Sequence, residues 1–155
     1  MREICQELID TIEKKCMPTA TTTEAQVFFL KLKGDYHRCL SEFLKGEQHK
    51  EAADQAKESY HQATTEAEKL KTTHPIRLGL ALNYSVYYYE ILNSPEHACK
   101  LAKTAFDSAI AELDGLEEDE YRDAAAIMQL IRDNLTLWTS DHGEEKGLEG
   151  MGQAE

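Results

Sequence analysis

The sequence predicts an all-α protein built as an antiparallel array of about six helices. Helix-favouring residues, chiefly Ala, Glu, Lys, Leu and Gln, dominate the composition. The chain has only three prolines, and all of them lie at expected helix boundaries: Pro18, Pro75 and Pro95. Between these boundaries, apolar residues recur three and four positions apart, and most links are short. Short links make consecutive helices antiparallel neighbours.

The first two helices are expected over residues 2–16 and 23–45. The apolar stripe of the first helix recurs at helical spacing and consists of Ile4, Cys5, Leu8 and Ile12. The second helix begins with a capping box, in which Thr23 is followed three residues later by Gln26. Gly34 interrupts this helix at a cost of about 1 kcal/mol relative to Ala. It indicates either a close contact with another helix or simple tolerance.

The third helix, over residues 47–71, carries a narrow seam that suits one close neighbour. Its members are mostly small and lie three and four positions apart: Ala53, Ala56, Tyr60, Ala63, Ala67 and Leu70. The fourth helix lies within His74–Pro95, the least polar stretch of the chain. Apolar side chains surround it on all sides, which is typical of a helix buried between neighbours.

One line of residues on the fourth helix differs from the rest of its surface. It introduces a glycine, an amide and a carboxylate into an apolar element, and it consists of Gly79, Leu82, Asn83, Val86 and Glu90. These positions recur at helical spacing and therefore share one face. The pattern predicts the wall of a groove.

The last two helices are expected from Pro95 to about Leu113 and from about Asp119 to Trp138. Ser94 is the expected N-cap of the fifth helix, and proline suits its first position. The expected core face of the fifth helix holds Ala98, Leu101, Ala102, Ala105, Phe106, Ala109 and Ile110. The apolar residues of the sixth helix include Ile127, Leu130, Ile131, Leu135 and Leu137.

A length of 155 residues fits one domain with a sizeable core. We expect this helical domain over residues 1–139 and an acidic, disordered tail over residues 140–155. The net charge of −12 argues against nucleic acid and anionic membranes as main partners, because both bind basic surfaces. No apolar run reaches the roughly 18 residues that span a bilayer.

The beginning of the chain and its cysteines suggest the cellular setting. Charged residues interrupt every early apolar run, so a secretory leader is not expected. The four cysteines include no Cys-x-x-Cys pair. We therefore expect reduced thiols and a cytoplasmic location, with the nucleus also open.

Motifs for catalysis and for metal or cofactor binding are missing from the sequence. It contains no Gly-x-Ser-x-Gly, no phosphate-binding glycine loop and no His-Glu-x-x-His. Its six histidines do not pair with cysteines at zinc-finger spacing. We therefore expect neither an enzyme nor a bound metal or cofactor.

Two cations and two amides are the candidate binding residues. Lys31 and Arg38 are seven positions apart and share one face of the second helix. They form either a solvated charged face or an anion site, in which Arg binds a phosphate through two hydrogen bonds and Lys adds a point charge. Asn83 and Asn134 lie on otherwise apolar helices, where an unpartnered buried amide costs about 1–3 kcal/mol. Each amide is therefore expected to meet a partner or to bind a ligand, such as an extended peptide backbone.

Four stretches resemble the 14-3-3 family, and the resemblance extends from the first residue to about Asp141. They are Lys31–Tyr36 (KLKGDY), His74–Pro95, Leu101–Asp107 (LAKTAFD) and Met128–Asp141 (MQLIRDNLTLWTSD). Runs of this length are far more specific than a short motif. The resemblance implies an all-helical, non-catalytic adaptor. Such an adaptor binds phosphoserine or phosphothreonine peptides of phosphorylated client proteins in an amphipathic groove.

The resemblance also implies roles for individual residues. Arg38 corresponds to the arginine that holds the phosphate, and Lys31 reaches the peptide backbone. Asn83 and Asn134 clamp the peptide main chain, and Glu90 lies along the polar side of the groove. The apolar side is lined by Leu82, Val86, Ile127, Leu130, Leu137 and Trp138.

Two departures from the family pattern change the expected affinity. The chain resembles only the last six of the family's nine helices, so we expect a 14-3-3-like fold truncated at its N-terminus. The absent helices hold two phosphate ligands and most of the dimer interface, so the family-type dimer is not expected. Cys39 stands where the family has a tyrosine of the phosphate pocket. With only Arg38 left to hold the phosphate, phosphopeptide binding should be weakened.

Two other interpretations stay open. In the first, the chain is a non-catalytic helical scaffold that binds unphosphorylated amphipathic peptides in the same groove. Replacing Arg38 with Ala would then change little. In the second, the chain is a tetratricopeptide-like solenoid, which fits the Ala, Tyr and Phe spacing of the fourth and fifth helices. The sequence contains no repeat of about 34 residues to support it.

Overall fold

Every regular element in the described part of the chain is helical. The computed structural model describes residues 2–16, 18 and 21–146. Its elements are α1 (Arg2–Thr11), a π-helical turn η1 (Ile12–Cys16), α2 (Thr23–Phe43), α3 (Gly46–Ala67), α4 (Pro75–Glu90), α5 (Pro95–Glu112), a short 3-10 turn η3 (Leu113–Gly115) and α6 (Glu118–Lys146). The all-α class predicted from the sequence is confirmed. None of these helices is long and apolar enough to cross a membrane.

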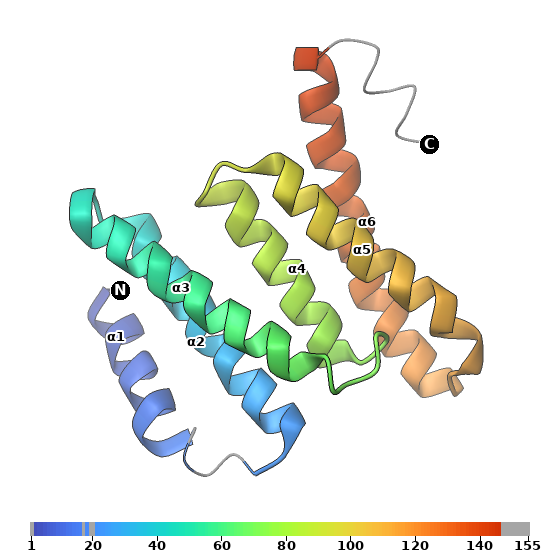
Figure 1. The fold of residues 1–155 in the computed structure, drawn as a ribbon, viewed down its shortest axis with the longest axis horizontal. Helices are drawn as coiled ribbons and strands as arrows, with labels where there is room; N and C mark the ends of the chain where they lie inside the picture. The colour runs from blue at the N-terminus through green and yellow to red at the C-terminus, as the bar shows by residue number, and fades with distance from the viewer. Residues whose placement is uncertain (1, 17, 19–20, 147–155) are drawn as a thin grey trace.

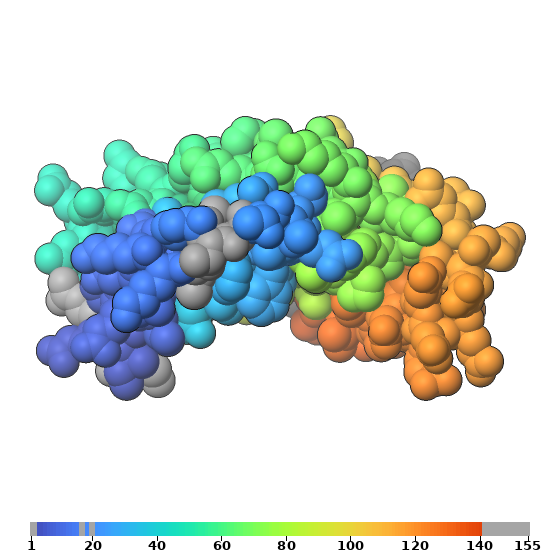
Figure 2. Space-filling model, turned by 90° about the horizontal axis from the view of Figure 1, so that it is seen from below, coloured from blue at the N-terminus to red at the C-terminus, as the bar shows by residue number. Residues whose placement is uncertain are grey.

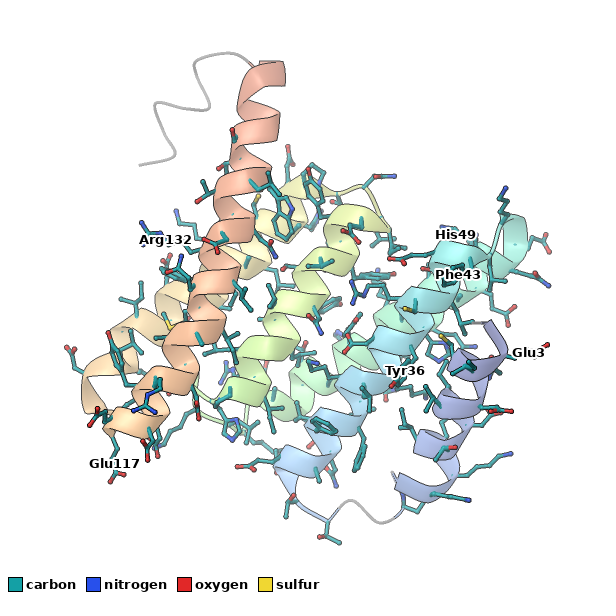
Figure 3. The ribbon with its side chains drawn as sticks, turned by 180° about the vertical axis from the view of Figure 1, so that it is seen from behind. Glu3, Tyr36, Phe43, His49, Glu117 and Arg132 are labelled. Atoms are coloured by element: carbon teal, nitrogen blue, oxygen red, sulfur yellow. The ribbon has the colours of Figure 1, made fainter. Side chains whose placement is uncertain are left out.

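The helices form two layers. In Figure 1, α3 lies over α2 and α5 lies over α6, while α4 lies between the two pairs. Seen from behind, α2, α4 and α6 form the near layer, and α1 lies beside α2 (Figure 3). In the space-filling view the molecule is an arch, hollowed on one side between the α1 end and the α6 end (Figure 2). The α2–α4–α6 layer faces this hollow.

A threonine side chain fixes the start of α2. The Thr22 hydroxyl accepts a hydrogen bond from the backbone N–H of Ala25 at 3.1 Å. This bond satisfies one of the N–H groups that the first turn of a helix leaves without a partner. The sequence predicted Thr23 as the capping residue. The N-cap is instead Thr22, one residue earlier.

A histidine fixes the start of α4. The His74 ring accepts a hydrogen bond at Nδ1 from the backbone N–H of Ile76, at 3.1 Å. Its other nitrogen, Nε2, lies 2.8 Å from a carboxylate oxygen of Glu24. Because Nδ1 accepts, Nε2 carries the proton and donates to Glu24. His74 therefore caps α4 and ties it to the first turn of α2.

Three clusters of buried apolar residues form the core. The largest joins α2, α3 and α4 around Tyr60, and the second joins α4, α5 and α6 around Ile131. A smaller cluster joins α1, α2 and α3, and its buried members are Cys5, Ile9, Leu40 and Ala52. Helix α4 packs against α2, α3, α5 and α6. Its position agrees with the apolar surface that the sequence shows on all its sides.

The predicted seam of α3 packs closely against its neighbours. Ala56, Tyr60 and Ala63 have no exposed surface. A Cβ atom at Gly34 on α2 would lie 2.8 Å from two ring carbons of Tyr60, closer than side chains approach one another. Gly34 is therefore needed for a close contact between α2 and α3, one of the two alternatives that the sequence left open.

The buried face of α1 differs from the predicted stripe. Cys5, Ile9 and Ile12 are buried, whereas Ile4 is 59% exposed and Leu8 is 37% exposed. Two adjacent lines of this helix are apolar, and spacing alone does not decide which of them faces α2. Ile110 of α5 departs from prediction in the same way, since it is 47% exposed.

Two predicted boundaries also change. Helix α3 ends at Ala67 instead of residue 71. Helix α6 continues to Lys146, into the region where the sequence predicted a disordered tail from residue 140. A single glycine, Gly143, costs only about 1 kcal/mol inside a helix and does not have to end one. Residues 147–155 of the predicted tail lie outside the described residues.

Candidate functional site

Helices α2, α3 and α4 bring the polar residues of the site together. Lys31, Asp35 and Arg38 are four and three positions apart on α2, so their side chains leave the same face of the helix. Asn83 approaches them from α4 and Tyr60 from α3. We call these five residues the Asp35 cluster.

The carboxylate of Asp35 lies at the centre of this cluster. It accepts a hydrogen bond from Lys31 Nζ at 3.1 Å. The side-chain nitrogen of Asn83 lies 3.1 Å from each carboxylate oxygen. The Tyr60 hydroxyl donates to Oδ1 at 2.5 Å. One half-buried carboxylate therefore holds donors from three helices, and it fixes the positions of Lys31 and Asn83.

Arg38 lies one turn beyond Asp35 and is half-buried. Burial lowers the pKa of the guanidinium, but its interactions with Tyr60 and Asp35 outweigh burial, so the pKa lies above its ordinary value. The Nε atom is buried and has no hydrogen-bond partner within the described ranges. An arginine carries five N–H donors, so Arg38 keeps its charge and has donors available for an oxyanion.

Tyr60 of α3 holds the Asp35 carboxylate from the buried side of the cluster. Its side chain is fully buried, and burial together with the charge of Asp35 raises the pKa of the phenol far above its usual range. The hydroxyl therefore stays protonated and donates to Asp35. Because the same ring packs against Gly34, the position of the carboxylate depends on the packing of α2 against α3.

Apolar residues of α4 and α6 continue the site beside the Asp35 cluster. Leu82, Val86 and Ile127 are half-buried and pack against the core of α4, α5 and α6. Leu130 is 52% exposed and Leu137 is 57% exposed. We call these five residues the apolar strip. Exposed leucines on a folded surface are candidates for contact with a partner.

Trp138 does not line this strip as predicted. It is only 4% exposed, and its ring stacks on that of Tyr89 with centroids 4.7 Å apart. Trp138 lies one position beyond Leu137, which rotates it by about 100° around the helix and into the core. It supports the strip from inside, although the sequence predicted it as a lining residue.

The other predicted site residues lie near these two groups. Asn134 is half-buried on α6, and no residue in the described part of the chain hydrogen-bonds to its side chain. Gly79 lies one turn before Asn83, where a Cβ atom would contact Lys31 Cε at 3.5 Å. Glu90 is exposed at the end of α4. Gly79 therefore lies beside Lys31, and Asn83 is linked to Lys31 through the carboxylate of Asp35.

Sequence reasoning did not assign Asp35 or Tyr60 to the site. Asp35 follows Lys31 by four positions and precedes Arg38 by three, so a carboxylate on the same face as two cations was a readable signal. Tyr60 gave no such signal, because a tyrosine within a seam of alanines is expected to be a core residue that packs against a neighbouring helix. The described side chains form no group of three or more His, Cys, Asp and Glu residues that could hold a metal ion.

Comparison with known proteins identifies the fold. The sequence model of the 14-3-3 protein family matches residues 1–139. The chain belongs to the 14-3-3 family. It is 58% identical over 146 residues to the 14-3-3-like protein GF14 epsilon of Arabidopsis thaliana, covering 94% of this chain and 58% of that protein. It is 55% identical over 158 residues to 14-3-3 protein 7 of Solanum lycopersicum, covering 99% and 63%.

A further 14-3-3 protein, from Eimeria tenella, is 58% identical over 142 residues, which cover 91% of this chain and 51% of that protein. This 14-3-3 chain therefore spans between half and two thirds of the length of these relatives. The matched region includes all residues of the Asp35 cluster and of the apolar strip.

Proposed function

We propose that this 14-3-3 chain acts as a non-catalytic adaptor that binds phosphoserine or phosphothreonine peptides along α2, α4 and α6. In this proposal Arg38 binds the phosphate, while Lys31, Asn83 and Asn134 hold the peptide main chain. The observation that supports it best is the carboxylate of Asp35, which bonds Lys31 and Asn83 and lies one turn before Arg38 on α2. The partners would be phosphorylated client proteins in the cytoplasm.

The charges of the Asp35 cluster favour an anionic ligand. Lys31 and Arg38 face one carboxylate, so the cluster keeps a net positive charge inside a protein whose net charge is −12. A phosphorylated side chain carries about −1.5 to −2 charges and three strong acceptor oxygens. Arg38 would contact these oxygens through the N–H donors of its guanidinium.

The apolar strip suits the remainder of an extended peptide. Leu130 and Leu137 are more than half exposed. They lie on α6, which forms one layer with α2 and α4 (Figure 3). Amides fix the main chain whatever its sequence, and an apolar wall accepts side chains of different shapes. We therefore propose an amphipathic groove with the cations of α2 on one side and the leucines of α6 on the other.

We expect the 155-residue chain alone to bind phosphopeptides weakly. A charge-assisted hydrogen bond contributes about 1.5–3 kcal/mol, and each 1.4 kcal/mol is a factor of ten in affinity. In this chain Arg38 is the one proposed phosphate ligand, and Cys39 occupies a position for which the family resemblance implies a tyrosine. Sub-micromolar, phosphate-dependent binding by the pure chain would contradict this expectation.

The test is a fluorescence-polarisation titration with a labelled phosphoserine peptide and its unphosphorylated twin. The wild-type chain should bind the phosphopeptide more tightly, and Arg38→Ala should remove the difference between the two peptides. Arg122→Ala is the matched control, because this arginine lies outside the Asp35 cluster, in the first turns of α6, and its side chain is 71% exposed. A phosphate preference that survives Arg38→Ala would refute the proposed role of this arginine.

Binding of unphosphorylated amphipathic peptides is the second candidate function. The exposure of Leu130 and Leu137 favours it, and so does the bond that already joins Lys31 to Asp35. In this case wild-type chain and Arg38→Ala bind both peptides equally. The same titration therefore separates the two functions.

A further inference from the structure

Two cysteines meet where α1 packs against α2. Cys5 is 4% exposed and belongs to the small core cluster with Ile9, Leu40 and Ala52. Cys39 is half-buried and packs against the same cluster from α2. Both cysteines therefore pack in the same cluster, and both thiols are free.

A second contact fixes how α1 and α2 lie against each other. Lys33 Nζ on α2 is 2.7 Å from a carboxylate oxygen of Glu13, which follows α1 in the turn η1. The two segments run antiparallel. Cys5 precedes Glu13 in the chain, whereas Cys39 follows Lys33, so both cysteines lie on the same side of the ion pair. With the ion pair at one end, docking of α1 places the two cysteines in one packing cluster at the other end.

We propose that Cys5 and Cys39 are a redox modification site, at which an intramolecular disulfide forms by exchange with a low-molecular-weight disulfide such as oxidised glutathione. The cross-link would hold α1 on α2 independently of the packing between them. An S–S bond is about 2.05 Å long. Two cysteines that pack in one cluster across the α1–α2 contact can reach this length by side-chain rotation and a small shift of α1.

The exchange balances in two steps. The thiolate of Cys39, the more exposed of the pair, attacks one sulfur of oxidised glutathione and releases a glutathione thiolate, which takes up the proton that Cys39 lost. The Cys5 thiolate then attacks the Cys39 sulfur of this mixed disulfide and releases the second glutathione. The two protein thiols are oxidised to one disulfide, and one oxidised glutathione is reduced to two thiols.

The surroundings of Cys39 predict a disulfide that forms slowly and resists reduction. Burial, the neighbouring Cys5 thiol and Glu42 raise the pKa of the Cys39 thiol, and the charge of Arg38 opposes them only in part. Little thiolate is therefore present at neutral pH, which slows attack. Once formed, the disulfide is sheltered by the same burial from reductants in solution. These properties describe a structural bond under oxidising conditions more than a fast sensor.

The test is peptide mapping of the full 155-residue chain after incubation with oxidised glutathione. Trypsin cuts after Arg2, Lys14, Arg38 and Lys45, which places Cys5 in peptide 3–14 and Cys39 in peptide 39–45. We expect these two peptides to be joined and to separate on reduction. Because the bond closes a loop of about 35 residues, the oxidised chain should melt roughly 10 °C above the reduced chain.

Matched variants identify the pair. Cys99 is half-buried and packs against the core of α4, α5 and α6, so Cys99→Ser should keep the linked peptides and the shift in melting temperature. Cys39→Ser and Cys5→Ser should each lose both. The proposal is overturned if the wild-type chain keeps Cys5 and Cys39 as free thiols or as separate glutathione adducts. Linkage of Cys39 to a different cysteine would overturn it equally.

Discussion

At the scale of single residues, Asp35 shows how one carboxylate organises a basic site. Lys31, Asn83 and Tyr60 all donate to it, and its charge contributes to the raised pKa of Arg38. Without Asp35 the two cations would repel each other, and a buried phenol would lose its partner, at a cost of about 1–3 kcal/mol. The carboxylate therefore places the donors before any ligand arrives.

His37 makes the stability of the chain depend on pH. Its side chain is only 5% exposed, and burial lowers the pKa of the imidazole from 6.5 to about 4. The charge of Lys33 lowers it as well, while Glu13 raises it in part. Between these two pKa values the unfolded chain binds a proton that the folded chain does not. The contribution of His37 is therefore complete above pH 6.5 and is lost as the pH falls toward 4.

We expect this loss to reach roughly 2–3 kcal/mol in the free energy of unfolding at pH 4. Urea titrations at pH 7 and pH 4.5 would measure it, with His37→Gln as the test variant. The wild-type chain should lose more stability on acidification than His37→Gln does. His61→Gln, at an exposed histidine of α3, should behave as the wild type. Equal losses in the wild type and His37→Gln would refute the prediction.

The sequence was more informative about which residues matter than about what they touch. It identified Lys31, Arg38, Asn83 and Asn134, because cations at seven-residue spacing and amides on apolar helices are unusual. It could not show that Asp35 bonds both Lys31 and Asn83. That arrangement depends on the packing of α2 against α4, which spacing within one helix does not determine.

At the scale of helices, local signals predicted the starts well and the buried faces less well. Prolines mark the starts of α4 and α5. His74 also caps α4 with a side-chain hydrogen bond, whereas Ser94 makes no such bond at the start of α5. The face of α1 is different, because the choice between Leu8 and Ile9 depends on where α2 lies. The buried face of α3 was predicted correctly, because its mostly small residues gather on the side that touches α2 and α4.

The contact between α2 and α3 gives a prediction at this scale. Gly34→Ala would place a methyl group 2.8 Å from the Tyr60 ring, which is buried and held by Asp35. Overpacking of this kind costs about 1–3 kcal/mol, more than the gain of about 1 kcal/mol in helix propensity. We therefore expect Gly34→Ala to lower the free energy of unfolding, measured by urea titration.

Gly79→Ala is the matched control for this prediction. Gly79 also lies inside a helix, but its Cβ would make an ordinary contact of 3.5 Å with Lys31 Cε. Here the gain in helix propensity should dominate, and stability should rise by up to about 1 kcal/mol. The interpretation of Gly34 fails if the two substitutions change stability in the same direction.

At the scale of the whole molecule, α4 connects the two parts of the fold. It contributes to the α2–α3–α4 core through Tyr84 and Tyr87, and to the α4–α5–α6 core through Leu78. The same helix presents Asn83 to the Asp35 cluster and Leu82 to the apolar strip. The charged and apolar halves of the proposed groove therefore each include a residue of this central helix, which sets their relative positions.

This arrangement separates residues that stabilise the fold from residues available to a ligand, even where they are adjacent. Trp138 is 4% exposed and stacks on Tyr89, so Trp138→Ala should lower the free energy of unfolding by about 3–5 kcal/mol. Leu137 is 57% exposed, so Leu137→Ala should change stability by less than about 1 kcal/mol. Urea titrations of the two variants measure both effects.

The same pair tests the apolar strip in binding. If the proposed groove holds a peptide against α6, Leu137→Ala removes apolar area from the contact and should weaken peptide affinity by about tenfold. The phosphopeptide titration that tests Arg38 measures this loss in a chain that is still fully folded. Unchanged affinity in Leu137→Ala would exclude this leucine from the groove. It would also leave the Asp35 cluster as the only supported part of the site, since that cluster does not depend on Leu137.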